Sequence, residues 1–302
     1  MFFFKKNLEI FYNEYPFPQR SDNWILNYSK IQNSKLLEMG IPNELLNKPM
    51  KVLDAGCGTG SFSLHFALAN PKSEITAINI SQSSIDYGKK QAKSLNIENV
   101  TFIKADIFSL PNEISSKNYD IVYCRGVLHH TLNPKLGMSI LSKLVSPNKF
   151  MVIGLYHKGR YKVRLMRLIL DLLAGNNSEQ RIRFARKLFP KHCHHHVTKS
   201  FEDEPLSREV EDVCLADKFV VPHESYHSFV DTNTYLRKLG FNNLHKNISK
   251  PEKRIRREKL IHKIISFFPL SKIYKEDLAD DFIGLTVGKE MLLVLSQKFP
   301  PK

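Results

Sequence analysis

Residues 51–60 read Lys-Val-Leu-Asp-Ala-Gly-Cys-Gly-Thr-Gly. An apolar Val-Leu pair stands before three glycines at alternate positions, and apolar residues recur at helical spacing over residues 61–70. This order predicts a strand, a tight turn and a helix. Glycine has no Cβ and tolerates positive φ, so Gly56, Gly58 and Gly60 would let backbone amides come close to a ligand.

The alternation of strands and helices continues along the chain. Apolar, β-rich stretches predict strands at residues 75–78, 100–104, 119–124 and 150–155. Helical spacing between them predicts helices at residues 84–95 and 136–144. Strands that alternate with helices at such short intervals favour a parallel sheet with helices on both faces.

Beyond residue 156 the pattern changes. The sequence predicts basic amphipathic helices at residues 159–174 and 180–188, an acidic loop at 201–219, a helix at 232–239, and strands near 241–248 and 291–295. We therefore divide the chain into an N-terminal helical and aromatic lid (1–48), a core (49–156), a helical cap insertion (157–230) and a C-terminal part of the core (231–302) with a second insertion at about 250–285. Both insertions are expected over the carboxyl ends of the strands, where open sheets bind ligands.

The composition indicates a globular protein of a reducing compartment. Hydrophobic residues make up 42% of the 302 residues, and the four cysteines have no paired short spacing. The N-terminus lacks the apolar run of a signal peptide, and no stretch approaches about 18 uninterrupted apolar residues. We expect a cytoplasmic protein without a transmembrane segment, with peripheral membrane contact left open.

The chain is strongly basic, with a formal charge of +15. Such a charge suits an anionic partner, namely RNA, an acidic membrane surface or an anionic small molecule. An overall compositional bias toward Asn, Ile and Lys explains the same charge equally well. DNA is not an expected partner.

Four segments, taken in order, resemble a known family. Besides residues 51–60, they are Ile75 to Ser81, the run Phe-Ile-Lys-Ala-Asp-Ile at 102–107, and the run from Tyr119 to His130. With its glycines as G-x-G-x-G, the first segment resembles the class I S-adenosylmethionine-dependent methyltransferases, of the type 11 or type 12 domains. Dinucleotide-binding proteins instead space the third glycine wider, as G-x-G-x-x-G.

The resemblance implies an α/β fold, a Rossmann-like doubly wound and mostly parallel seven-stranded sheet with helical cap insertions, and S-adenosylmethionine as the cofactor. The positions that it assigns to the cofactor are Asp54, Gly56, Cys57, Gly58, Gly60, Asn79, Ile80, Asp106, Ile107 and Cys124. The loop backbone and Asp54 would hold the methionine part, Asp106 the adenine amine between Ile80 and Ile107, and Cys124 would end its strand beside the sulfonium.

Asn79 departs from the family pattern, which usually has Asp or Glu there to hold the ribose. An Asn carbonyl still accepts hydrogen bonds, but neutral ones are about half as strong as those of a carboxylate. Asn79 therefore predicts weaker ribose binding.

The N-terminal run Phe-Tyr-Asn-Glu-Tyr-Pro-Phe-Pro, residues 11–18, resembles a segment found ahead of the core in some methyltransferases. Its two prolines predict an extended conformation. Tyr12 and Tyr15 are expected to close over the cofactor, with a plain packing arm as the alternative.

His129 and His130 are the candidates for a catalytic general base, because histidine titrates near neutrality. The alternative is that they shape the loop after the fourth strand, since positioning alone can carry methyl transfer. The candidate substrate contacts are Arg125, Tyr156, His223 and Tyr226. The near-consecutive histidines of residues 192–196 cannot all converge on one ion, so no metal site is expected.

Three arginines of the cap, Arg160, Arg164 and Arg167, are spaced to share one helical face. They are expected to form either a solvated surface or a contact for phosphate or anionic lipid.

The sequence therefore predicts an enzyme that moves a methyl group to an O, N or C nucleophile of a small-molecule or RNA acceptor. The alternatives are a lipid or quinone methyltransferase anchored by the amphipathic helix at residues 165–173, and a non-catalytic cofactor-binding partner protein, which Asn79 favours.

Overall fold

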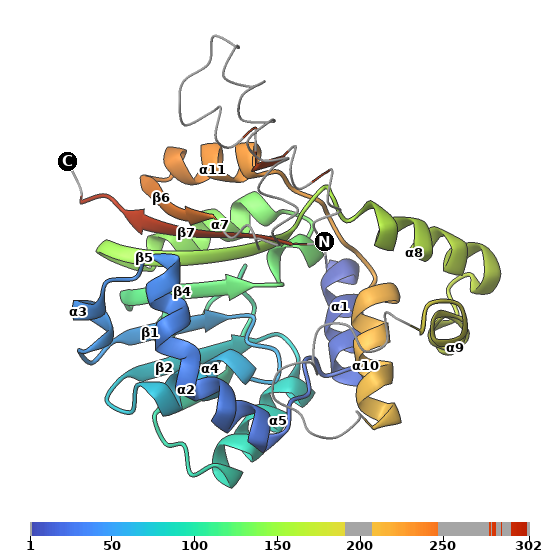
Figure 1. Cartoon of the computed structure of the whole chain (residues 1–302), viewed down its shortest axis with the longest axis horizontal. Coiled ribbons are helices and arrows are strands. Elements are labelled where there is room, and N and C mark those ends of the chain that lie inside the picture. Colours follow the sequence, from blue (N-terminus) through green and yellow to red (C-terminus); the bar gives the residue numbers. More distant parts are fainter. Residues whose placement is uncertain are drawn as a thin grey trace.

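The computed structural model of the chain describes residues 2–190, 207–246, 278, 280, 281, 285 and 291–300 (Figure 1). Within these residues, seven strands form one sheet in the order β3-β2-β1-β4-β5-β7-β6. The strands are β1 (Lys51–Ala55), β2 (Glu74–Asn79), β3 (Val100–Lys104), β4 (Tyr119–Arg125), β5 (Val145–Tyr156), β6 (Phe241–Lys246) and β7 (Met291–Lys298). Neighbouring strands are parallel except for β7, which runs antiparallel to both β5 and β6. The predicted α/β fold with a mostly parallel seven-stranded sheet is confirmed.

Helices cover both faces of the sheet, because successive side chains of a strand point to opposite faces. In β1, Val52 joins the apolar cluster beneath α2 (Asp22–Met39), α4 (Ser61–Ala69) and α5 (Gln82–Ser94). The next residue, Leu53, joins the cluster beneath the 3-10 turn η1 (Leu128–His130), α7 (Pro134–Lys143) and α11 (Phe229–Lys238). The short helices α3 (Asn43–Leu46) and α6 (Asn112–Ser115) each bury one apolar side chain in these clusters, Leu46 and Ile114 respectively.

The starts of these helices are encoded locally. Ser81 Oγ accepts a hydrogen bond from Ser84 N at the start of α5, and Asn133 Oδ1 accepts one from Leu136 N at the start of α7. Such side chains satisfy backbone donors that lack a partner within the helix. Pro134 follows in the first turn of α7, where proline is favoured because it has no N–H to satisfy.

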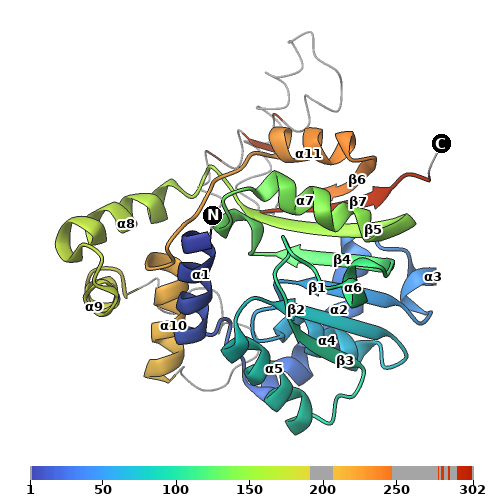
Figure 2. The same cartoon turned by 180° about the vertical axis from the view of Figure 1, so that it is seen from behind.

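A third apolar cluster joins four helices beyond the sheet (Figures 1 and 2). These are α1 (Phe2–Glu14), α8 (Tyr161–Ala174), α9 (Ser178–Leu188) and α10 (Arg208–Phe219). Phe11 of α1 packs there with Val163 and Leu170 of α8 and with Leu215 and Phe219 of α10. From here on, the cap means this four-helix unit, which joins α1 of the predicted lid to three helices of the predicted cap insertion. None of the helices within the described residues is long and apolar enough to cross a lipid bilayer.

The structure corrects two expectations. Residues 208–219 were expected to lie in a loop, but they form α10, whose N-cap is Ser207 and whose buried residues include Val213 and Phe219. Residues 11–18 were expected to be extended throughout, but α1 continues to Glu14 and ends just ahead of Pro16, since a residue before proline is disfavoured in a helix.

The remaining boundaries agree closely, although β5 begins five residues before its predicted start. The histidine run at residues 192–196 and most of the second predicted insertion lie outside the described residues. The domain boundaries remain predictions.

Candidate active site

A cavity of about 580 Å³ lies at the carboxyl ends of β1, β2, β3 and β4 and reaches beneath α1 and α10. Here the chain order reverses, since β1 has β2 on one side and β4 on the other; such switch points form ligand crevices in open sheets. The cavity is lined by twelve of the sequence-predicted site residues, namely Tyr12, Asp54, Gly56, Cys57, Gly58, Asn79, Ile80, Asp106, Ile107, Arg125, His130 and Tyr156. The other six, Tyr15, Gly60, Cys124, His129, His223 and Tyr226, are not among its lining residues.

The start of the glycine loop is held against β2. Gly56 N and Cys57 N donate hydrogen bonds to Ile78 O of β2, at 2.8 and 2.9 Å. Gly58 has φ +57°, and a Cβ there would lie 2.1 Å from Phe17 O. Glycine is therefore required at position 58 by both conformation and space.

Gly60 and Cys124 serve the packing around the cavity. A Cβ on Gly60 would lie 2.5 Å from the ring of Phe102, so this glycine lets that ring pack beneath the loop. Cys124 points into the apolar cluster below the sheet, because its neighbours Tyr123 and Arg125 take the alternate positions of β4 that face the cavity.

Asp54 is a buried carboxylate at the end of β1. It accepts a hydrogen bond from Ser63 Oγ at 2.7 Å, which ties β1 to α4. Burial raises the pKa of Asp54 to about 7. A nearby cation would favour the ionised form, so this end of the cavity suits an ammonium group.

Asn79 and Asp106 stand at the ends of β2 and β3. Asn79 Oδ1 accepts a hydrogen bond from Ser81 N at 2.8 Å, and Asp106 Oδ1 accepts one from Phe108 N at 3.0 Å. Each side chain is thus held by the loop that follows it, and both line the cavity.

The N-terminal segment closes one side of the cavity. Ser81 Oγ donates to Tyr12 O at 2.8 Å, Ser83 N donates to Asn13 Oδ1 at 3.2 Å, and Thr59 N donates to Phe17 O at 3.2 Å. The segment therefore bridges the loop after β1 and the loop after β2. Tyr15 points the other way and packs on Phe11 in the cap.

The two histidines after β4 form one hydrogen-bonded chain. His130 Nδ1 lies 2.8 Å from His223 O, and this ring nitrogen must donate because a carbonyl only accepts. His130 Nε2 then accepts from His129 Nε2 at 3.0 Å, and His129 Nδ1 accepts from Tyr156 N at 3.2 Å. All four ring nitrogens are engaged, and burial lowers the pKa of His130 to about 3 and that of His129 well below its usual value. This geometry favours a structural role.

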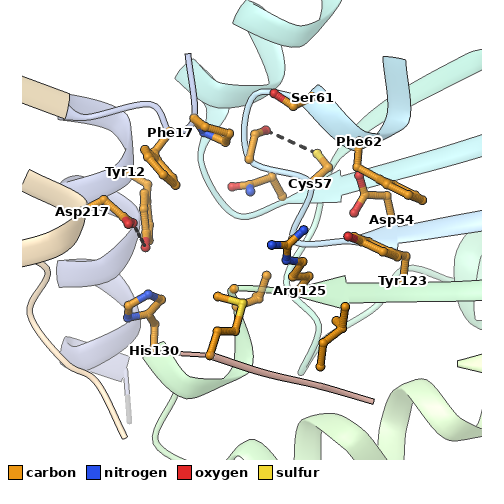
Figure 3. Close-up of a pocket in the computed structure, with 18 of the residues that line it drawn as sticks. Tyr12, Phe17, Asp54, Cys57, Ser61, Phe62, Tyr123, Arg125, His130 and Asp217 are labelled. Carbon is orange, nitrogen blue, oxygen red and sulfur yellow. Dashed lines mark hydrogen bonds between the residues drawn. The ribbon is translucent and has the colours of Figure 1, made fainter. Parts of the chain in front are cut away.

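Asp217 of α10 was not predicted, yet it reaches the cavity opposite the glycine loop. Figure 3 shows Tyr12, Asp217 and His130 on one side and Asp54, Phe62 and Tyr123 on the other. Tyr12 Oη donates to Asp217 Oδ1 at 3.2 Å, and burial raises the pKa of Asp217 to about 6. Sequence reasoning missed it because the acidic pattern of residues 201–219 predicts a loop.

A buried ionic network supports the wall beside Asp217. The Arg160 guanidinium lies 3.9 Å above the centre of the Tyr156 ring, and Arg160 Nε lies 3.7 Å from Glu224 Oε2. Arg167 Nε lies 3.4 Å from Glu224 Oε1, and Tyr226 Oη donates to the same carboxylate. Arg160 is only 3% exposed, so the solvated-surface interpretation is wrong for this arginine. Tyr226, through its hydrogen bond to Glu224, and His223, through its carbonyl, therefore support the wall without lining the cavity.

Aromatic residues that line the end of the cavity away from Asp217 were also not predicted from the sequence. Trp24 stacks on Tyr28 at 4.7 Å, and the Arg20 guanidinium lies 4.7 Å from the centre of the Trp24 ring. With Tyr123 and Arg125 of β4, these residues line the cavity. The i, i+4 spacing of Trp24 and Tyr28 was the available sequence signal. Two guanidinium groups at one end suit a carboxylate.

Comparisons with known proteins agree with this geometry. Residues 46–166 match a family model described as a methyltransferase domain. The chain is 28% identical to an uncharacterized protein of Synechococcus sp. over 74% of this chain and 54% of that protein. It is 25% identical to the ubiquinone biosynthesis O-methyltransferase of Rickettsia akari over 65% of this chain and 63% of that enzyme. The solved structure of PKMT2 from Rickettsia typhi in complex with AdoHcy superposes with a TM-score of 0.58 at 19% identity, covering 84% of this chain and 49% of that one.

The strand order and the cavity at the carboxyl ends of the strands are consistent with the methyltransferase domain that residues 46–166 match. The match to this family model covers less than half of the 302 residues. The chain spans about half the length of the first curated relatives it matches, 54% and 56%.

Proposed function

We propose that this protein binds S-adenosylmethionine in the cavity and transfers its methyl group to an acceptor held beneath the cap. One observation carries the proposal: Asp54 with the glycine loop, Asn79 and Asp106 come from three different segments of the chain and line one cavity. The matched methyltransferase domain supports the same interpretation.

The residues present fit the cofactor. Asp54 would hold the ammonium group, whose charge would favour the ionised carboxylate. Arg20 and Arg125 would hold the carboxylate of the methionine part. Asn79 would contact the ribose, and Asp106 would accept from the adenine amine. When bound, the cofactor supplies a methyl group on a sulfonium, which is a good electrophile.

We further propose that the cap side of the cavity orients the acceptor. There Asp217 would accept the proton that an attacking hydroxyl or amine must lose, because a carboxylate with a pKa of about 6 is largely ionised at neutral pH and still accepts a proton readily. Tyr12 positions Asp217 through its hydrogen bond. His129 and His130 would fix Tyr156 in the wall and exclude water.

Among acceptors, we propose a small molecule over RNA. Helices α1 and α10 line one side of the cavity, and the relative from Rickettsia akari bears the name of an O-methyltransferase of ubiquinone biosynthesis. We also propose a cytoplasmic location, because the four cysteines have no paired short spacing of the kind that disulfide-rich secreted proteins show.

The test is labelled methyl transfer from S-adenosylmethionine into fractionated cell extract. We expect label in a small-molecule or lipid fraction, and a loss of about 100-fold or more in rate for Asp217→Asn, within the usual range for removing a general base. Label in RNA would contradict the acceptor assignment. Cofactor binding without label in any fraction would favour a non-catalytic cofactor-binding protein.

A further inference from the structure

Helix α8 carries an apolar stripe on its outward face. Tyr161, Leu165, Leu168 and Leu172 follow one another at intervals of four, three and four residues, so they lie along one side of the helix. The three leucines are 60%, 54% and 79% exposed. Single exposed leucines are common, but four aligned apolar residues form a continuous surface.

This stripe is not the packing face of the helix. Val163 and Leu170, on the opposite side of α8, are fully buried in the cap with Phe219 of α10 and Ile182 of α9. In both views α8 and α9 project at one edge of the molecule, away from the sheet (Figures 1 and 2). Helix α8 is therefore already anchored in the cap, while its stripe faces outward.

Positive charge surrounds the stripe. Residues 157–190 contain nine Lys or Arg and two Asp or Glu. Lys162 and Arg164 flank the stripe and are exposed, as are Arg183 and Lys187 on α9. Asp171, one of the two acidic residues, is neutralised by Arg181 at 2.6 Å. A leucine stripe bordered by Lys and Arg is the pattern of helices that lie in a membrane interface.

We infer that α8 docks the protein onto an anionic phospholipid membrane, with the leucines among the acyl chains and the basic side chains at the headgroups. The first residue of α8 follows Arg160, which lines the cavity. Docking would therefore bring the cap side of the cavity close to the membrane. If the proposed methyl transfer also holds, an acceptor dissolved in the bilayer would have a short path to the site.

The test is co-sedimentation of the full chain with vesicles, either of phosphatidylcholine alone or of phosphatidylcholine mixed equally with phosphatidylglycerol. We expect binding to the anionic vesicles that weakens as salt rises. The double variant Leu168→Glu and Leu172→Glu should lose at least about tenfold in partition coefficient, because each change removes buried apolar area and adds a repelled charge. The matched control is Leu136→Glu on α7, also an exposed leucine at 42%, which should bind as the wild type does.

Cofactor titration of the same variants keeps this inference separate from the proposed activity, since none of the stripe residues lines the cavity. Absence of binding to anionic vesicles, or equal binding by wild type and double variant, would overturn the docking surface. A second contrary result would be that the wild type binds no vesicles and forms a dimer in sedimentation velocity, while the double variant is a monomer. The stripe would then be the contact surface for a second copy of the chain.

Discussion

Replacing Gly58 by Ala tests how the N-terminal segment and the glycine loop depend on each other. An alanine at φ +57° costs about 1–2 kcal/mol for the left-handed conformation. Its Cβ would lie 2.1 Å from Phe17 O, which forces the segment away and removes the Thr59 N–Phe17 O hydrogen bond, worth about 0.5–1.5 kcal/mol. We expect the losses in unfolding and binding free energy to sum to about 1.5–3.5 kcal/mol.

The assay pairs chemical unfolding with calorimetric titration of S-adenosylmethionine. Gly240→Ala is the matched control, because Gly240 has φ +84°, a Cβ added there would meet no atom within 4 Å, and the residue lies outside the cavity lining. The control should lose stability and keep cofactor affinity, whereas Gly58→Ala should bind at least about tenfold more weakly, the equivalent of 1.4 kcal/mol. The reasoning is refuted if Gly58→Ala binds within threefold of the wild type and is no less stable than the control.

Three further changes have defined outcomes. Asn79→Asp should keep or tighten cofactor affinity in calorimetry, because a carboxylate keeps the acceptor for Ser81 N and adds a charged oxygen for the ribose; a tenfold loss would contradict the ribose assignment. At saturating cofactor, the transfer rate should rise with pH through about 6 as Asp217 ionises. The Tyr12→Phe variant should move that rise to higher pH, because the lost hydrogen bond favours the ionised carboxylate. If the pH profile of the variant matches that of the wild type, Asp217 does not accept the proton. The unfolding free energy should fall as pH drops below the usual histidine pKa of about 6.5. The reason is that buried His65, with its pKa lowered to about 3, takes up a proton only on unfolding. The His65→Gln variant should show a smaller change of unfolding free energy with pH, and an unchanged pH dependence would show that His65 contributes nothing.

The fold was predictable because its signals are local. The glycine loop and the alternation of apolar strands with amphipathic helices lie within short stretches, and the structure places β1 and α4 where residues 51–70 predict them. Helix α10 escaped prediction because Glu209, Glu211 and Asp212 make its first turns look like a solvated loop. Its helical character rests on Phe219 and neighbouring apolar residues that pack against α1, α8 and α9, which is a tertiary effect.

The candidate site was predictable in part for the same reason. Asp54, Asn79 and Asp106 could be named from the sequence because the resemblance to the methyltransferase family assigns these positions, and the carboxyl ends of parallel strands meet at one edge of the sheet. Asp217 could not, because the Tyr12–Asp217 contact joins segments 205 residues apart in the chain. His129 and His130 looked like bases because sequence carries no information on which partners occupy the ring nitrogens.

The central claim is that the cavity at the ends of β1 to β4 holds S-adenosylmethionine. Calorimetric titration of the purified full chain tests it most directly, with Asp106→Ala as the comparison. We expect one cofactor molecule per chain, displacement by S-adenosylhomocysteine, and at least about tenfold weaker binding by the variant, since removing a hydrogen-bonded carboxylate costs about 1.5–3 kcal/mol. No binding at millimolar cofactor, or equal binding by the Asp106→Ala variant, would contradict the account.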